Sequence, residues 1–283
     1  MQRILLGFKA FDVHELACHF IARHAGIYAA HGLDVQLIDT TFQSSEQLPP
    51  RTFEAACTAA LIAWLHGAPV RVVFVACDRP MFWLVGRRGG PAAADTGPLR
   101  IAGYPPGTPP DVLLRRVLGG EAGAARREAL VLPARDDVAR LGLLQGGDVD
   151  AAIISTAVPR SRLVRRGIEI LRFFGDTLRV PTTGLAVHRN LQMREPELVR
   201  TMCACYRESL QLLHADERLA VAALTAALDL TQDDAHEVVA TLRHCCTRDG
   251  RTTTAIESGA IDGMSRLLGV KPPPEALYAT SAD

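Results

Sequence analysis

The sequence has 283 residues, with 31 Lys and Arg against 31 Asp and Glu, so its formal net charge is zero. Hydrophobic residues make up 48% of the chain and charged residues 22%, which excludes a disordered protein and is typical of one large or two modest globular domains. The balanced charge lacks the long-range attraction that binders of nucleic acid and anionic membranes use, so neither partner is expected.

The first 90 residues predict a strand-helix-strand-strand-helix-strand-strand succession. The first helix is amphipathic, because Leu16, Phe20 and Ile27 recur at spacings near four and seven, and Gly32 stands where it would stop. The strands are short apolar or alternating runs bounded by polar or Pro-containing loops. The predicted strands are residues 3–8, 35–38, 53–57, 70–77 and 81–85, and the second helix is residues 58–66.

A Pro- and Ala-rich stretch at residues 91–98 is the clearest break in the chain, and a second α/β pattern follows it. Residues 181–184 interrupt the chain again, before a returning strand at 185–187. From Glu197 the pattern is helical almost to Ala260. Between the two breaks we expect strands at residues 100–103, 130–132, 151–154 and 168–173 and helices at residues 110–118 and 138–144. The succession predicts an α/β fold.

The N-terminal residues predict no signal peptide, because Arg3 precedes an apolar run that is too short and no small-residue cleavage pattern follows. The longest apolar run elsewhere, residues 72–77, is far below the roughly 20 residues of a membrane span. The sequence as given therefore predicts a cytoplasmic protein, or a periplasmic one if a leader has been removed.

The seven cysteines predict reduced thiols in a core rather than a disulfide framework, because their number is odd and their spacing irregular. His14 and Cys18 lie four residues apart, as the two histidines of a zinc-protease helix do, but His19 is rotated by about 100° and no third ligand is marked. His14 and Cys18 could still share a metal, but no metal and no cofactor are predicted. The chain also lacks the Gly-Lys-Ser/Thr, G-x-G-x-x-G and G-x-S-x-G motifs of common nucleotide-binding proteins and hydrolases.

Three segments stand in an order and spacing that resemble one family: residues 22–35 with the run Gly-Leu-Asp-Val, residues 67–73, and residues 144–153 with the run Gly-Gly-Asp-Val-Asp-Ala-Ala. They resemble the SsuA/THI5-like (NMT1-like) family of periplasmic binding protein type 2 proteins, over about residues 3–215. The resemblance implies two α/β lobes with a ligand cleft between them and hinge closure on binding. Lobe one would be residues 1–90 plus 185–283 and lobe two residues 96–180, with crossovers near 91–95 and 181–184.

Open α/β sheets bind ligands beyond the carboxyl ends of their strands, and this rule selects the candidate ligand-binding residues. They are Phe11, Asp12, His14, Cys57, Thr58, Tyr104, Gly107, Thr108, Ser155, Thr156, Thr182 and Thr183. The loop of residues 104–110 is either an anion site with free N–H groups at a helix start or a plain strand-to-helix connection. Asp12 either accepts a ligand N–H or caps a helix, and Ser155 and Thr156 are ligand contacts or simple strand ends.

The resemblance implies a solute-binding protein that holds a small organic molecule, anionic or heteroaromatic, and that has an ABC transporter permease as a possible partner. Catalysis would then be absent.

The alternative is a cytoplasmic enzyme on the same scaffold, a decarboxylase, desulfinase or pyrimidine synthase acting on a small aromatic acid, with His14, Cys57 or Arg79 as candidate residues. The cysteine cluster and the histidine of the family's pyrimidine synthase should fall near residues 181–187 and Thr58, where this chain has neither. A ligand-sensing regulator would need a DNA-binding segment, and the sequence marks none.

Overall fold

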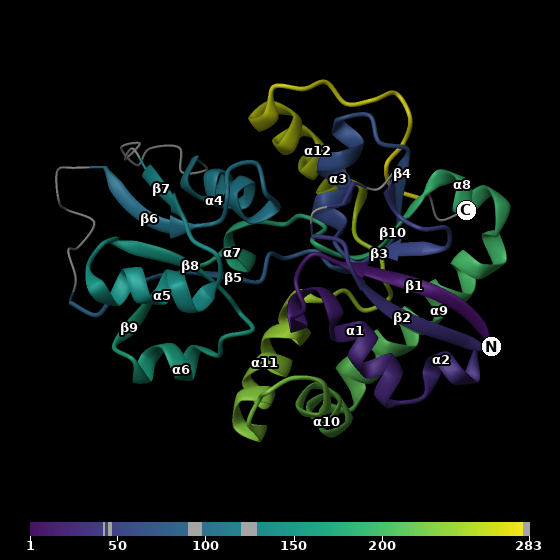
Figure 1. The fold of residues 1–283 in the computed structure, drawn as a ribbon, viewed down its shortest axis with the longest axis horizontal. Helices are drawn as coiled ribbons and strands as arrows, with labels where there is room; N and C mark the ends of the chain where they lie inside the picture. Colours follow the sequence, from purple (N-terminus) through teal and green to yellow (C-terminus); the bar gives the residue numbers. More distant parts are fainter. Residues whose placement is uncertain (42, 45–46, 90–97, 120–128, 280–283) are drawn as a thin grey trace. The chain divides into compact units, whose positions relative to one another are not determined.

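The computed structural model describes the whole chain except residues 42, 45–46, 90–97, 120–128 and 280–283 (Figure 1). The chain divides into two compact units: unit 1 is Met1–Arg79 with Arg179–Asp283, and unit 2 is Pro80–Leu178. Each unit contains one five-stranded sheet and its own helices. The predicted α/β class is therefore confirmed.

The sheet of unit 1 has the order β2-β1-β3-β10-β4. Its strand β1 is parallel to β2 and β3, and the late strand β10 is antiparallel to both β3 and β4. The carboxyl ends of β1, β3 and β4 therefore share one edge with the start of β10. The strands are β1 (Gln2–Phe8), β2 (Leu33–Asp39), β3 (Thr52–Glu54), β4 (Val70–Cys77) and β10 (Thr183–His188).

The helices of unit 1 include a C-terminal group in which α9 and α10 pack on α1 and α11 packs on α10. Leu16, Phe20 and Ile27 are buried, as their spacing predicted, but the first helix ends at His24 and Ile27 belongs to a separate short helix. The predicted helical run after Glu197 is divided among four helices. The unit 1 helices are α1 (Val13–His24), α2 (Ile27–Ala30), α3 (Cys57–Leu65), α8 (Arg189–Arg194), α9 (Pro196–Ala215), α10 (Glu217–Ala227), α11 (Gln232–Cys245) and α12 (Thr254–Leu268).

Two glycines allow the backbone to lie close to β4 at Phe74. A Cβ on Gly184 would lie 2.0 Å from the Phe74 carbonyl oxygen, and a Cβ on Gly250 would lie 2.0 Å from the Phe74 ring. Gly250 also has a φ of +84°, which other residues rarely adopt. The backbone N–H of Val75 donates to the Gly250 carbonyl at 2.9 Å, so the segment after α11 runs against β4.

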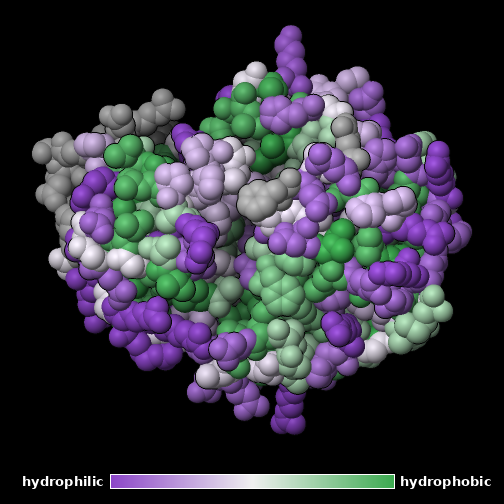
Figure 2. All heavy atoms as spheres, in the orientation of Figure 1, coloured by the Kyte–Doolittle hydropathy of each residue, from purple (hydrophilic) through white to green (hydrophobic). Residues whose placement is uncertain are grey.

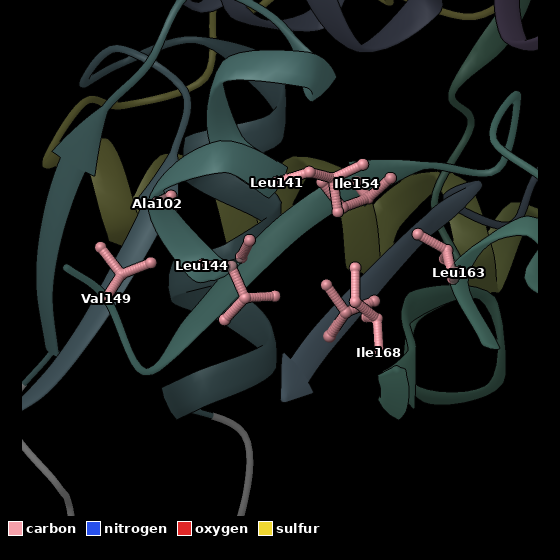
Figure 3. Packing of buried hydrophobic residues seen from close by; sticks show 9 residues of the cluster. Ala102, Leu141, Leu144, Val149, Ile154, Leu163 and Ile168 are labelled. Carbon is pink, nitrogen blue, oxygen red and sulfur yellow. The ribbon is translucent and has the colours of Figure 1, made fainter. Parts of the chain in front are cut away.

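The sheet of unit 2 has the order β7-β6-β8-β5-β9, in which β6 is parallel to β7 and β8, and β5 is antiparallel to β8 and β9. Figure 3 shows part of its core, where Leu144 of α5 and Leu163 of α6 pack with Ile154 of β8. The strands are β5 (Phe82–Arg87), β6 (Leu99–Gly103), β7 (Ala129–Pro133), β8 (Ala151–Ser155) and β9 (Ile168–Phe173). The helices are α4 (Pro109–Gly119), α5 (Asp137–Gly146), α6 (Arg160–Arg165) and α7 (Phe174–Thr177).

The boundaries between the units differ from the expected ones. The sequence assigned residues up to 90 to the first lobe, whereas the strand β5 pairs with β8 and β9, so the chain leaves unit 1 after Arg79. The expected crossover at 91–95 lies outside the described residues. The chain returns at Arg179, shortly before the expected crossover at 181–184. An apolar run identifies a strand but not its partner, which is why the first boundary was misplaced.

Within the described residues, no helix combines the length and the apolar composition that a membrane span needs. On the drawn face, Figure 2 shows purple hydrophilic side chains with green hydrophobic ones gathered between them. The exposed large hydrophobic side chains that the structure describes are Met1, Phe11, Leu130, Val138, Val164, Leu171, Met193 and Leu267.

Candidate functional site

The carboxyl edge of the unit 1 sheet brings together two of the predicted threonines. The Thr58 N–H donates to the Thr182 carbonyl at 3.2 Å, and the Thr58 hydroxyl donates to the Pro181 carbonyl at 2.9 Å. The Thr182 hydroxyl in turn donates to the Cys77 carbonyl at 3.2 Å. Thr58, Thr182 and Thr183 are all buried. The Thr58 hydroxyl therefore connects the start of α3 to the segment before β10, and the Thr182 hydroxyl connects that segment to the end of β4.

Asp12 caps the helix α1, which was one of the two roles that the sequence allowed. Its carboxylate accepts hydrogen bonds from the N–H groups of His14 at 2.9 Å and Glu15 at 3.2 Å. Phe11 is 53% exposed, and its ring makes edge contacts with Phe8 and Phe20 at centroid distances of 5.6 and 5.7 Å. The loop after β1 therefore presents an aromatic ring beside a helix cap.

Two ionisable groups in the first turn of α1 are held uncharged by burial. Burial raises the pKa of Glu15 to about 8, although its carboxylate accepts the Lys9 N–H at 2.7 Å. Burial also lowers the pKa of His14 to about 4. At neutral pH Glu15 is therefore mostly protonated and His14 mostly neutral. Glu15 was not among the predicted site residues, and its signal in the sequence was an acid beside the strand-end loop.

Cys57 is a buried thiol rather than a thiolate. Its Sγ donates to the Phe74 carbonyl at 3.6 Å, and burial raises its pKa well above the ordinary value. Reactive cysteines have a lowered pKa, so this environment opposes the catalytic role that the enzyme hypothesis gave to Cys57. All seven cysteines are free, and Cys203 alone among them is not fully buried.

In unit 2, a buried arginine connects the carboxyl ends of β6, β7 and β8. The Arg140 guanidinium lies 3.8 Å from the centroid of the Tyr104 ring, which directly follows β6. Its Nη1 donates to the Ala134 carbonyl at 3.0 Å and its Nη2 to the Asp137 carboxylate at 2.7 Å. Arg140 is 2% exposed, and its buried Nε has no hydrogen-bond partner among the residues that the structure describes. Buried polar groups in proteins normally all form hydrogen bonds, whereas the Nε–H of this guanidinium is an unused donor.

Asp137 joins this arginine to the end of β8. Its carboxylate also accepts the Ser155 N–H at 3.3 Å. Burial raises the pKa of Asp137, and the neighbouring Arg140 opposes that shift. Thr156, the next residue, is buried and its N–H donates to the Met81 carbonyl at 3.1 Å. The sequence named Tyr104 and Ser155 but missed Arg140 and Asp137, which lie on a helix rather than directly after a strand.

The loop before α4 uses its own groups internally. The Gly107 N–H donates to the Asp111 carboxylate at 2.9 Å, and the N–H and hydroxyl of Thr108 donate to the Pro105 carbonyl at 3.2 and 2.7 Å. Asp111 is buried and also accepts from Arg115 Nε at 3.0 Å. A carboxylate of the chain therefore occupies the position at Gly107 where an anionic ligand was expected. These bonds favour the plain strand-to-helix connection over the anion site.

The described residues contain no cluster of three His, Cys, Asp or Glu side chains arranged to hold a metal ion. Helix α1 carries His14 and Cys18, the pair whose spacing is close to that of a zinc-protease helix, together with His19. His19 is buried, and its Nδ1 lies 3.2 Å from the Tyr28 hydroxyl. Cys18 is also buried, and burial raises the pKa of its thiol well above the ordinary value. Metal ligation would need that thiol deprotonated.

Comparison with protein-family models and with curated proteins finds no match. Solved structures do match. The periplasmic aliphatic sulphonate binding protein SsuA from Escherichia coli is 15% identical, with a TM-score of 0.73 over 98% of this chain and 95% of its own. The zinc-bound ligand-binding component of an ABC-type import system from Staphylococcus aureus is 11% identical, with a TM-score of 0.73 over 97% of this chain and 94% of its own. The chain has the periplasmic binding protein fold.

The periplasmic binding protein fold also occurs in an enzyme that resembles this chain. The desulfurization enzyme DSZB is 12% identical, with a TM-score of 0.66 over 95% of this chain and 92% of its own. The fold predicted from the three sequence segments is therefore confirmed. Because one fold carries both binding proteins and an enzyme, the function has to be argued from the residues.

Proposed function

We propose that this protein binds a small organic solute, anionic or heteroaromatic, between two lobes that close around it. The periplasmic binding protein fold supports the proposal, since relatives of that fold are named as sulphonate-binding and import-system proteins. Unit 1 and unit 2 would be the two lobes, and the chain segments at Arg79 and Arg179 would act as hinges. By the same analogy this protein would lie in the periplasm and would deliver the solute to the permease of an ABC importer.

The observation that carries this proposal is the unused donor of Arg140. A guanidinium that is buried at the carboxyl edge of a sheet, with Nε unpaired, suits the oxygen of a carboxylate or sulphonate. Tyr104 supplies an aromatic face beside it, and Phe11 in unit 1 supplies another. Glu15 and His14 are uncharged at neutral pH, so their edge suits the neutral part of a solute rather than a second ionic group.

The proposal is tested by a thermal-shift screen of sulphonates, aromatic carboxylates and pyrimidines, followed by calorimetric titration of the best ligand. Arg140→Lys keeps the charge but loses the planar fork, so we expect it to weaken binding at least about tenfold. Arg135→Lys is the matched control, because Arg135 is an exposed neighbour in the same unit. The affinity of this control variant for the ligand should equal that of the unmodified protein. Equal affinity of the two variants would refute the assignment of Arg140.

An enzyme on this scaffold is the second candidate, and the similarity to DSZB is the observation that favours it. A decarboxylase or desulfinase would use His14, Cys57 or Arg79. Arg79 lines a pocket that contains none of the predicted solute-binding residues, and burial keeps Cys57 protonated, so neither supports the candidate. Release of bicarbonate or sulfite from the bound ligand during prolonged incubation would establish an enzyme, and recovery of intact ligand would favour the binding protein.

A further inference from the structure

A pocket lies wholly within unit 1, where the chain leaves that unit and where it returns. Its volume is about 460 Å³, which is within the range of small-molecule sites. Arg79 and Arg179 line it from the two connecting segments, and the segment after α11 supplies the other wall. The other lining residues include Asp78, Arg248, Asp249, Arg251, Thr252 and Thr253. None of the twelve residues predicted to bind solute is among them.

The charges of this pocket are unbalanced in favour of cations. Four arginines line it against two aspartates. Asp78 is buried and already committed, since it accepts hydrogen bonds from Arg179 and from the Thr252 hydroxyl at 2.8 Å. Arg248 and Arg251 are exposed and form no ion pair with any residue that the structure describes. Among the described residues that line the pocket, guanidinium groups therefore outnumber carboxylates.

The wall that carries Arg248 and Arg251 is held in place by the backbone. The Thr247 N–H donates to the Ala76 carbonyl at 2.8 Å, and the Thr247 hydroxyl donates to the Val75 carbonyl at 2.7 Å and accepts the Gly250 N–H at 3.1 Å. Gly250 packs on the Phe74 ring, where no larger residue fits. Binding would thus need little ordering of the loop.

We propose that this pocket binds a phosphate group, either free or as part of a phosphorylated small molecule, at a site separate from the solute site. Arginine forks match phosphate oxygens in geometry and charge, and Arg248 and Arg251 are the groups available to donate. The helix α12 begins at Thr254, next to the lining residue Thr253, so its positive end adds to the attraction. The volume leaves room for more than the phosphate itself.

The test is calorimetric titration with inorganic phosphate and, separately, adenosine 5′-monophosphate, at constant ionic strength maintained with chloride. We expect saturable binding of at least one probe. If adenosine 5′-monophosphate binds more tightly than inorganic phosphate, the ligand is a phosphorylated molecule rather than free phosphate. The variant Arg248→Gln/Arg251→Gln should weaken binding at least about tenfold. The control Arg218→Gln/Arg266→Gln removes the same charge from exposed positions outside the pocket and should change binding less than about twofold.

Asp249→Asn provides a test of opposite sign, because it removes a competing negative charge while it keeps an acceptor for the Arg251 N–H. It should tighten binding about two- to threefold. Absence of saturable binding for both probes would overturn the proposal, as would equal loss in the pocket and control variants. The pocket variant should leave the affinity for the solute found in the screen unchanged, which separates this test from that of the proposed function.

Discussion

At the carboxyl edge of the unit 1 sheet, burial leaves ionisable groups uncharged, whereas at the same edge of unit 2 a buried arginine is paired with a carboxylate. In unit 1, Glu15 and Cys57 keep their protons and His14 stays neutral. In unit 2, Arg140 is paired with Asp137. The difference shows that desolvation removes a charge unless a neighbour of opposite charge is buried with it. Under the proposed function, the acidic group of the solute would lie at the unit 2 edge and its neutral part at the unit 1 edge.

The largest expected effect concerns the reactivity of the Cys57 thiol at the unit 1 edge. Because burial holds Cys57 as a thiol, we expect it to react with iodoacetamide at pH 7 at least about 1,000-fold more slowly than free cysteine does. Mass spectrometry of the alkylated, digested protein measures this rate. Denatured protein is the control and should be labelled at all seven cysteines. Rapid labelling of Cys57 in the folded state would restore it as a catalytic candidate.

The next effect concerns the paired charges of unit 2. Arg140→Ala leaves Asp137 without its cation and removes the group that packs on Tyr104, so we expect it to lower the free energy of unfolding by about 3 kcal/mol. Urea denaturation measures the change. Arg135→Ala, at an exposed neighbouring position, should have little effect. A loss below about 1 kcal/mol for Arg140→Ala would show that the pair is not buried as described.

A smaller effect is a pH dependence due to Glu15. Its pKa is higher in the folded protein, about 8, than the ordinary 4.5, so the unfolded chain loses this proton first and stability falls as pH rises between those values. Glu15→Gln removes that penalty. Relative to the unmodified protein, the variant should gain stability with rising pH, by up to about 1.4 kcal/mol per unit.

Urea denaturation at pH 5, 6.5 and 8 measures the Glu15 effect. His14 titrates in both proteins, and its lowered pKa makes stability rise with pH at acid pH. Subtracting the free energy of unfolding of the unmodified protein from that of the variant removes this contribution. Glu197→Gln, on the exposed face of α9, is the control and should show no such trend in this range. A difference between Glu15→Gln and the unmodified protein that stays constant with pH would mean that Glu15 is ionised in the folded state.

The smallest expected effect is at the loop before α4. Thr108→Ala should change solute affinity less than about twofold, because the Thr108 hydroxyl donates to Pro105 and the Gly107 N–H to Asp111. Calorimetric titration beside Arg140→Lys gives the comparison directly. A loss at Thr108→Ala as large as at Arg140→Lys would return the anion site to this loop.

Local patterns predicted much of the fold because they report burial along a single element. The spacing of Leu16 and Phe20 correctly identified the buried face of α1. The same reasoning extended a strand through Cys57, where the structure has the start of α3 after a strand that ends at Glu54. Short apolar runs do not distinguish a strand from a buried helix, so such boundaries are the least predictable feature.

The amino-acid pattern alone was enough to predict the α/β order of the elements, the resemblance to the periplasmic binding protein fold, and the strand ends at which polar residues gather. It did not predict that β5 joins the sheet of unit 2, that Arg140 reaches Tyr104, or that Glu15 holds its proton, and these became visible in the folded chain. These three features depend on groups far apart in the chain and on exclusion from water. Neither dependence is encoded in the periodicity of one segment.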